Sequence, residues 1–242
     1  MTKNSKAAHE SRNLFLEGPA GRLEAILWKP VAQGRPALAA LVCHPHPLFG
    51  GTMHNKVVYQ AAKSLDALGL PVLRFNFRGA GISGGTHDRG RGEQGDVKAA
   101  LDYLAEQFPD VPLLVAGFSF GSWVGLRVGC ADDRARELIG MGTPVNTSDF
   151  SYLQNCEKPK LFVHGANDEH GEIGKVEALV GSLPGENRLV VVAGAEHFFV
   201  GKLEQVDEAI RNWITERHPE ITLRAGGGVR RTPEISAPIR YD

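Results

Sequence analysis

The sequence predicts an α/β fold, a mostly parallel, twisted sheet of about eight strands with helices packed on both faces. Short apolar runs alternate with segments of helical periodicity from residue 37 to residue 217. Runs such as residues 37–43 are apolar throughout, which is typical of strands that are buried on both faces. The helical segments between such runs form right-handed crossovers, so successive strands run parallel.

The expected elements follow in chain order. A polar segment at residues 1–12 predicts a flexible leader, and residues 13–17 and 22–28 flank a Gly-Pro turn that predicts a hairpin at one sheet edge. The remaining strands are expected at residues 37–43, 71–77, 111–116, 137–141, 160–164 and 188–192, and the helices at residues 55–68, 96–108, 119–130, 173–183 and 203–216.

The helices are predicted from their spacing and their end signals. The helix at residues 55–68 places Val57, Ala61 and Leu65 on one side, and Gly69 ends it. Residues 13–218 are expected to form one domain. The segment 219–242 contains a glycine triplet and no periodic apolar face, so it predicts a loosely ordered C-terminal tail.

The composition excludes several classes of function. The 242 residues are 42% apolar and 23% charged, as in ordinary globular domains, and the net charge of −1 offers no electrostatic basis for binding nucleic acid or an anionic membrane. No apolar stretch reaches the length of a membrane span, and the N-terminus has no signal-peptide core. These observations predict a cytoplasmic protein without nucleic-acid or membrane partners, and they are compatible with a homodimer.

A nucleophile elbow is predicted where the strand at residues 111–116 meets the next helix. The run Gly117-Phe118-Ser119-Phe120-Gly121 has the pattern Gly-x-Ser-x-Gly, in which a serine lies at the apex of a sharp strand-to-helix turn. A Cβ at either outer glycine would collide with the adjacent strand and helix. The serine hydroxyl is thereby held above the sheet, at the positive end of the new helix.

Other reactive side chains follow the ends of neighbouring strands. Asp168 comes shortly after the strand at 160–164, and His197 comes shortly after the strand at 188–192. Because parallel strands present their carboxyl ends at one edge of the sheet, Ser119, Asp168 and His197 are expected to meet there. Their chain order, Ser, Asp, His, is one of the known triad orders.

The chain resembles the α/β-hydrolase superfamily, and within it a small bacterial subgroup of lidless proteins similar to dienelactone hydrolases and predicted carboxylesterases. The superfamily resemblance rests on Gly117-Phe118-Ser119-Phe120-Gly121, His164-Gly165-Ala166-Asn167-Asp168 and Gly194-Ala195-Glu196-His197. The subgroup is marked by His44-Pro45-His46-Pro47-Leu48-Phe49-Gly50-Gly51-Thr52-Met53 and by Arg74-Phe75-Asn76-Phe77-Arg78-Gly79. Together these motifs cover about residues 13–217.

The resemblance implies a catalytic triad. Ser119 would be the nucleophile, His197 would take and return its proton, and Asp168 would fix the imidazole tautomer. Glu169 and Glu172 are nearby alternatives for the acid, but Asp168 occupies the position of the superfamily's acid.

An oxyanion hole needs two backbone N–H groups. Phe120, which follows the nucleophile, is expected to supply one. Pro45 and Pro47 have no N–H, so the second comes from His46 or Leu48, and the family's pattern favours His46.

The resemblance also bears on the substrate. Lid domains of the superfamily enter after the sixth strand, and residues 142–159 leave room for one short helix only, so a minimal cap or none is expected. The open pocket is expected to be walled by Phe49, Phe118, Phe120, Val145, Phe150 and Phe198. Such a site suits uncharged, moderately apolar esters of small or medium acyl groups.

The implied function is that of a serine carboxylic-ester hydrolase that acts through an acyl-enzyme. A thioesterase, peptidase or lactone hydrolase could use the same triad, and a catalytically silent binding module is the alternative from another class. No cofactor or metal is expected. Pro45 separates His44 from His46, and no helix follows Gly79-x-Gly81-x-x-Gly84 to hold a dinucleotide pyrophosphate.

Overall fold

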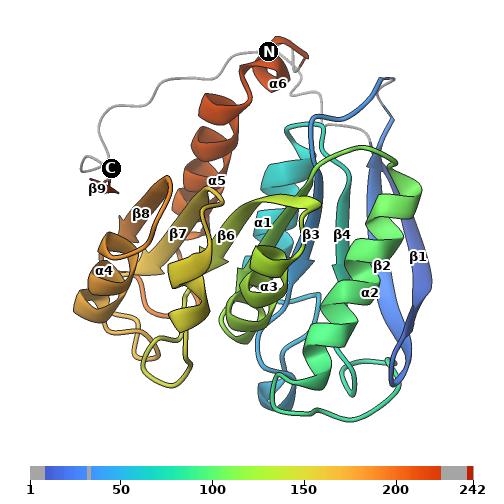
Figure 1. Ribbon diagram of the computed structural model, residues 1–242, viewed down its shortest axis with the longest axis horizontal. Coiled ribbons are helices and arrows are strands. Elements are labelled where there is room, and N and C mark those ends of the chain that lie inside the picture. Colours follow the sequence, from blue (N-terminus) through green and yellow to red (C-terminus); the bar gives the residue numbers. More distant parts are fainter. Residues whose placement is uncertain (1–8, 32–33, 225–238, 242) are drawn as a thin grey trace.

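The computed structural model describes residues 9–31, 34–224 and 239–241. These residues form one sheet in the order β1-β2-β4-β3-β5-β6-β7-β8-β9 (Figure 1). The strands are β1 (His9–Gly18), β2 (Gly21–Pro30), β3 (Ala39–Cys43), β4 (Val72–Phe75), β5 (Leu113–Phe118), β6 (Ala135–Met141), β7 (Lys160–Gly165), β8 (Asn187–Val192) and β9 (Ile239–Tyr241).

The centre of the sheet is parallel and its edges are antiparallel. The strands β4, β3, β5, β6, β7 and β8 are paired in parallel, whereas β1, β2 and β9 pair antiparallel. All residues of β3, β5 and β7 are buried, because helices cover both faces of these strands. The predicted class, a mostly parallel sheet with an antiparallel hairpin at one edge, is confirmed.

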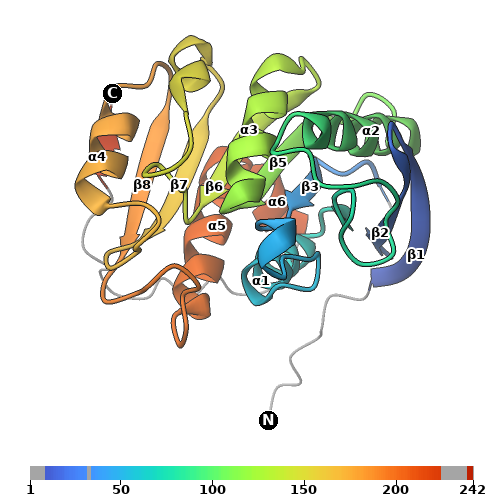
Figure 2. The same ribbon diagram turned by 90° about the horizontal axis from the view of Figure 1, so that it is seen from below.

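The helices divide between the two faces of the sheet. The α-helices are α1 (Lys56–Asp66), α2 (Gly92–Gln107), α3 (Phe120–Ala131), α4 (Ile173–Gly181), α5 (Leu203–Arg217) and α6 (Pro219–Arg224), and the 3-10 helices are η1 (Pro47–Phe49) and η2 (Ser151–Asn155). Figure 2 shows α2, α3 and α4 on one face and α1 and α5 on the other. Each set buries its own apolar cluster against the sheet, so the core has two layers.

The N-terminal leader is shorter than predicted, because β1 begins at His9 and pairs along its whole length with β2. The His9 ring stacks on Trp28 at a centroid distance of 4.6 Å, and its Nδ1 lies 2.8 Å from a carboxylate oxygen of Asp66. Residues 9–12 therefore belong to the sheet, and the prediction that they are flexible is wrong. Residues 1–8 lie outside the described residues.

The prediction of a loosely ordered tail at residues 219–242 is wrong for its described parts. Residues 219–224 form α6, which packs on the end of α5, and the β9 backbone pairs with β8 at the sheet edge. The glycine triplet lies outside the described residues.

Between β6 and β7 the chain makes only η2, so no cap domain enters there. Among the described residues, no helix combines the length and the apolar character needed to cross a membrane.

Candidate active site

The turn between β5 and α3 has the geometry of a nucleophile elbow. Ser119 has φ 53° and ψ −122°, a conformation that is unusual for a residue with a side chain. The glycines around it are required by contact. A Cβ on Gly117 would lie 2.2 Å from the carbonyl oxygen of Gly121, and a Cβ on Gly121 would lie 2.4 Å from the carbonyl oxygen of Cys43. Only hydrogen at these Cα atoms lets the strand turn sharply into the helix.

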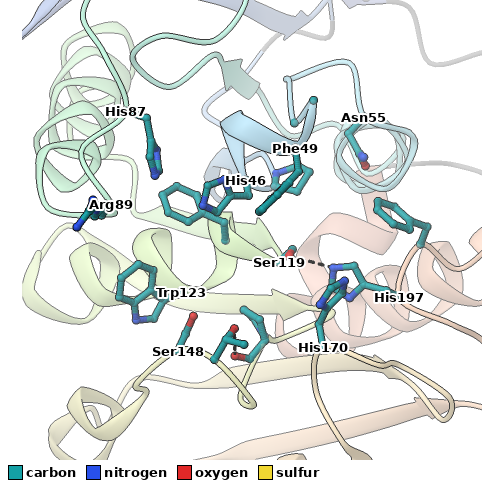
Figure 3. Close-up of a pocket in the computed structure, with 17 residues that line it drawn as sticks. His46, Phe49, Asn55, His87, Arg89, Ser119, Trp123, Ser148, His170 and His197 are labelled. Carbon is teal, nitrogen blue, oxygen red and sulfur yellow. Dashed lines mark hydrogen bonds between the residues drawn. The ribbon is translucent and has the colours of Figure 1, made fainter.

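Ser119, His197 and Asp168 meet above the carboxyl edge of the sheet. The Nε2 atom of His197 lies 2.9 Å from the Oγ atom of Ser119 (Figure 3). The Nδ1 atom of the same ring lies 2.9 and 2.8 Å from the two carboxylate oxygens of Asp168. Asp168 and His197 are buried. The predicted convergence of these side chains is present, and a proton can pass from the hydroxyl to the imidazole without any movement of the backbone.

The carboxylate of Asp168 is held by its own loop. Its Oδ1 atom accepts a hydrogen bond of 2.8 Å from the backbone N–H of His170. Burial works against ionisation, but the hydrogen bonds and charges of His197, His164 and His170 outweigh it and lower the pKa of Asp168. The alternatives to Asp168, Glu169 and Glu172, have exposed side chains that lie near His170 and Lys175, and within the described residues neither forms a hydrogen bond or ion pair with His197.

The loop after β3 is pinned by a buried histidine. His44 Nδ1 lies 2.6 Å from the carbonyl oxygen of Pro45, and His44 Nε2 accepts a hydrogen bond of 2.9 Å from the backbone N–H of Phe77. This pattern requires the neutral ring with its proton on Nδ1. Burial accordingly lowers the pKa of His44 to about 3.

The backbone N–H groups near Ser119 differ in whether they already donate a hydrogen bond within the protein. The N–H of Leu48 donates to the His46 ring at 3.2 Å. Within the part of the chain that the structure describes, the N–H groups of His46 and Phe120 donate no hydrogen bond to the protein. These two N–H groups are therefore available to an oxygen bound at Ser119.

A cavity of about 700 Å³ opens beside Ser119. Three of the six expected wall residues, Phe49, Phe120 and Phe198, line it. Its other lining residues are Pro45, His46, Gly50, Gly51, Asn55, His87, Arg89, Ser119, Trp123, Pro144, Thr147, Ser148, His170 and His197.

The predictions for Phe118, Val145 and Phe150 are wrong. Successive strand residues point to opposite faces, and Phe118, the last residue of β5, is fully buried with its ring 4.9 Å from that of His197. It supports the imidazole from behind. Val145 and Phe150 pack into the core cluster on the α2–α4 face instead of facing the cavity.

Several lining residues escaped the sequence prediction. Trp123 lies one helical turn after Ser119, and this i, i+4 spacing alone could have placed it on the same side of α3. His87 and Arg89 lie on the loop before α2, and no periodic pattern marks them. The loop that follows β4 is anchored by Arg78, whose guanidinium binds the buried carboxylate of Asp96 at 2.7 Å.

Comparisons with known proteins agree with this geometry. A family model described as alpha/beta hydrolase domain matches residues 41–218. The chain is 38% identical over 210 residues to an uncharacterized protein of Rickettsia prowazekii, covering 83% of this chain and 87% of that one.

Solved structures extend the similarity. An alpha-beta serine hydrolase homologue from Coxiella burnetii shares 38% identity and a TM-score of 0.79, covering 84% of this chain and 97% of that one. A serine hydrolase without lid from Xanthomonas campestris shares 36% identity and a TM-score of 0.80, covering 87% and 96% of the two chains. The fold and the family model agree, and the chain belongs to the α/β-hydrolase family.

Proposed function

We propose that this protein is a serine hydrolase that cleaves carboxylic esters of small to medium acyl groups through an acyl-enzyme. The observation that carries the proposal is the continuous chain of contacts from Asp168 through His197 to Ser119. A serine hydroxyl alone is a weak nucleophile at neutral pH, and a positioned imidazole overcomes this limit.

In the first step Ser119 Oγ attacks the ester carbonyl carbon while its proton moves to Nε2 of His197. Asp168 accepts the Nδ1–H of the same ring, so Nε2 is the free acceptor and the imidazolium that forms is stabilised by a carboxylate. The proton then passes from Nε2 to the leaving alcohol as the C–O bond breaks. Water repeats the sequence on the acyl-enzyme and releases the carboxylic acid.

The negative charge that develops on the carbonyl oxygen needs two donors. Phe120 is the first residue of α3, and the first N–H groups of a helix have no partner within the helix. The N–H of His46 is the second donor, because that of Leu48 is engaged by the His46 ring. The hydrogen bonds of His44 hold this loop in place.

The cavity favours esters of limited size. Its volume of about 700 Å³ lies in the range of sites that enclose small molecules. Two structures that share the fold at lower sequence identity are consistent with the same chemistry. An esterase from Pyrococcus furiosus and the Butyrivibrio proteoclasticus protein Est1E with ferulic acid share TM-scores of 0.75 with this chain at 17% and 18% identity.

The direct test is Ser119→Ala. The purified wild-type protein is expected to hydrolyse p-nitrophenyl acetate and butyrate and to be labelled by a fluorophosphonate, whereas the variant should do neither. Ser182→Ala is the matched control, because Ser182 follows α4 and does not line the cavity, and its hydroxyl donates to the Leu179 carbonyl and accepts from the Gln154 amide. This control should keep both activities.

A panel of thioesters, lactones and peptides then separates the reactions that the same triad supports. Wild-type protein that is folded but inert to esters and to the fluorophosphonate would refute the proposal and leave a catalytically silent binding module.

A further inference from the structure

The cavity has an uneven charge distribution. Among the residues that the structure describes, no aspartate or glutamate lines it, and Arg89 is the single Lys or Arg that does. The carboxylate of Asp168 is covered by His197, and the carboxylate of Glu93 is fully buried behind the loop that carries Arg89. A group bound in this cavity therefore meets one permanent positive charge and no exposed carboxylate.

The loop of Arg89 is built around Glu93. The backbone N–H groups of Asp88 and Gly90 each donate a hydrogen bond of 2.8 Å to the Glu93 carboxylate, and the His87 ring nitrogen lies 2.8 Å from it. Gly90 packs directly on the Trp123 ring, so closely that a Cβ would lie 2.3 Å from it. Both chain neighbours of Arg89 are thus fixed.

Arg89 itself has an unusual backbone and an uncommitted side chain. Its φ is 52°, a left-handed conformation that few residues other than glycine adopt. Within the described residues, no hydrogen bond or ion pair to its guanidinium is found, although Arg74, Arg78, Arg127 and Arg134 all contact protein groups. The fold therefore fixes the backbone of this loop, and no hydrogen bond or ion pair with the described residues engages the guanidinium of Arg89.

Arg89 lies at the opposite end of the cavity from the proposed general base. Figure 3 shows Arg89, His87 and Trp123 on one side of Ser119, and His197 and His170 on the other. Aromatic rings line the part of the cavity between Ser119 and Arg89, since the Phe120 ring lies 4.9, 5.5 and 5.9 Å from the rings of His46, His87 and Trp123. The cavity thus has an apolar middle and a cationic end.

We propose that Arg89 is a specificity-determining residue that binds an anionic group, a carboxylate, at the end of the substrate remote from the scissile ester. This inference rests on the proposed function and narrows its substrates to amphipathic esters that carry a carboxylate, in contrast to the uncharged esters expected from the sequence. A guanidinium offers paired N–H donors that match a carboxylate, and the aromatic wall covers the apolar segment between that carboxylate and the ester.

The test compares charged and neutral esters of the same length. The p-nitrophenyl monoesters of glutaric and adipic acid carry a free carboxylate on the acyl side, and their methyl-capped diesters are the neutral counterparts. The acetate ester of 4-hydroxybenzoate carries the carboxylate on the alcohol side, and its methyl ester is neutral. Each is assayed with wild-type protein, Arg89→Gln, Arg89→Lys and Arg91→Gln.

Arg89→Gln is expected to lower kcat/KM about tenfold for the charged esters of one series, mainly through KM, and to leave the neutral esters within about twofold. Arg89→Lys should restore part of the loss. Arg91→Gln is the matched control, because Arg91 is an exposed arginine of the same loop that does not line the cavity, and it should change neither class.

The series that responds shows whether the anion lies on the acyl or the alcohol side. An equal effect of Arg89→Gln on charged and neutral esters, or no effect in either series, would overturn the inference while leaving the proposed function intact. If the wild-type protein hydrolysed none of these esters, the proposed function would be refuted, and the inference with it.

Discussion

Replacing Asp168 by asparagine tests the proposed proton pathway most directly. In the structure, Oδ1 of Asp168 accepts hydrogen bonds from both the His170 N–H and His197 Nδ1, and Oδ2 accepts one from His197 Nδ1. An asparagine that keeps its oxygen towards the His170 N–H must present its NH₂ group to His197. The ring then becomes an acceptor at Nδ1 and carries its proton on Nε2, where it cannot receive the proton of Ser119.

The expected loss follows from this change of tautomer and from the missing negative charge beside the imidazolium. A triad with this substitution loses roughly 10⁴ in kcat, or about 5.4 kcal/mol of transition-state stabilisation. The shape of the side chain is unchanged, so KM for p-nitrophenyl butyrate should stay within about threefold. Steady-state kinetics and the rate of fluorophosphonate labelling measure the two effects separately.

Asp133→Asn is the control, since Asp133 has an exposed side chain outside the cavity, and it should leave kcat unchanged. Thermal unfolding of Asp168→Asn shows whether the variant is folded. A folded Asp168→Asn protein that retains more than a tenth of the wild-type kcat would refute the role given to this carboxylate.

Two further predictions concern the fold. Gly121→Ala places a Cβ 2.4 Å from the carbonyl oxygen of Cys43, so chemical denaturation should show that the free energy of unfolding falls by about 2 kcal/mol or more. A Cβ at Gly174, in α4, meets nothing within 4 Å, so Gly174→Ala should raise the free energy of unfolding by about 0.5–1 kcal/mol. Equal effects of the two substitutions would contradict the steric account. The hydrogen bond to Glu137 raises the pKa of His218 against the effect of burial, so this interaction stabilises the fold fully below pH 6.5 and is lost as the pH rises through the folded-state pKa. The difference in Tm between wild type and His218→Gln should therefore be large at pH 6 and small at pH 9, and a difference independent of pH would refute the assignment.

The reactive side chains could be predicted because each follows the end of a strand. Ser119, Asp168 and His197 come from β5, β7 and β8, whose parallel pairing brings their carboxyl ends to one edge. The local patterns of these segments agree with the sheet that they form, so the sequence predicts both the strands and their meeting point.

The cavity walls were harder to predict because they depend on contacts between distant residues. Phe118 is adjacent to Ser119 in sequence, but strand alternation turns it behind the imidazole. Arg89 reaches the cavity through a loop whose course depends on the carboxylate of Glu93, and no periodicity reports that contact. The start of β1 at His9 could not be predicted for the same reason, because the side chain of His9 is held by a contact with Asp66, which is distant in the sequence.

The buried ring of His44 has a consequence for behaviour in acid. Its pKa of about 3 lies below the 6.5 of an exposed histidine. At a pH between these values, His44 is therefore protonated in the unfolded chain and neutral in the native protein. Acidification over this pH range lowers the free energy of unfolding of the whole domain, and in the molecules that stay folded it leaves the loop after β3 unchanged. Mild acid should therefore reduce the number of folded molecules without giving a population in which the loop after β3 is loosened.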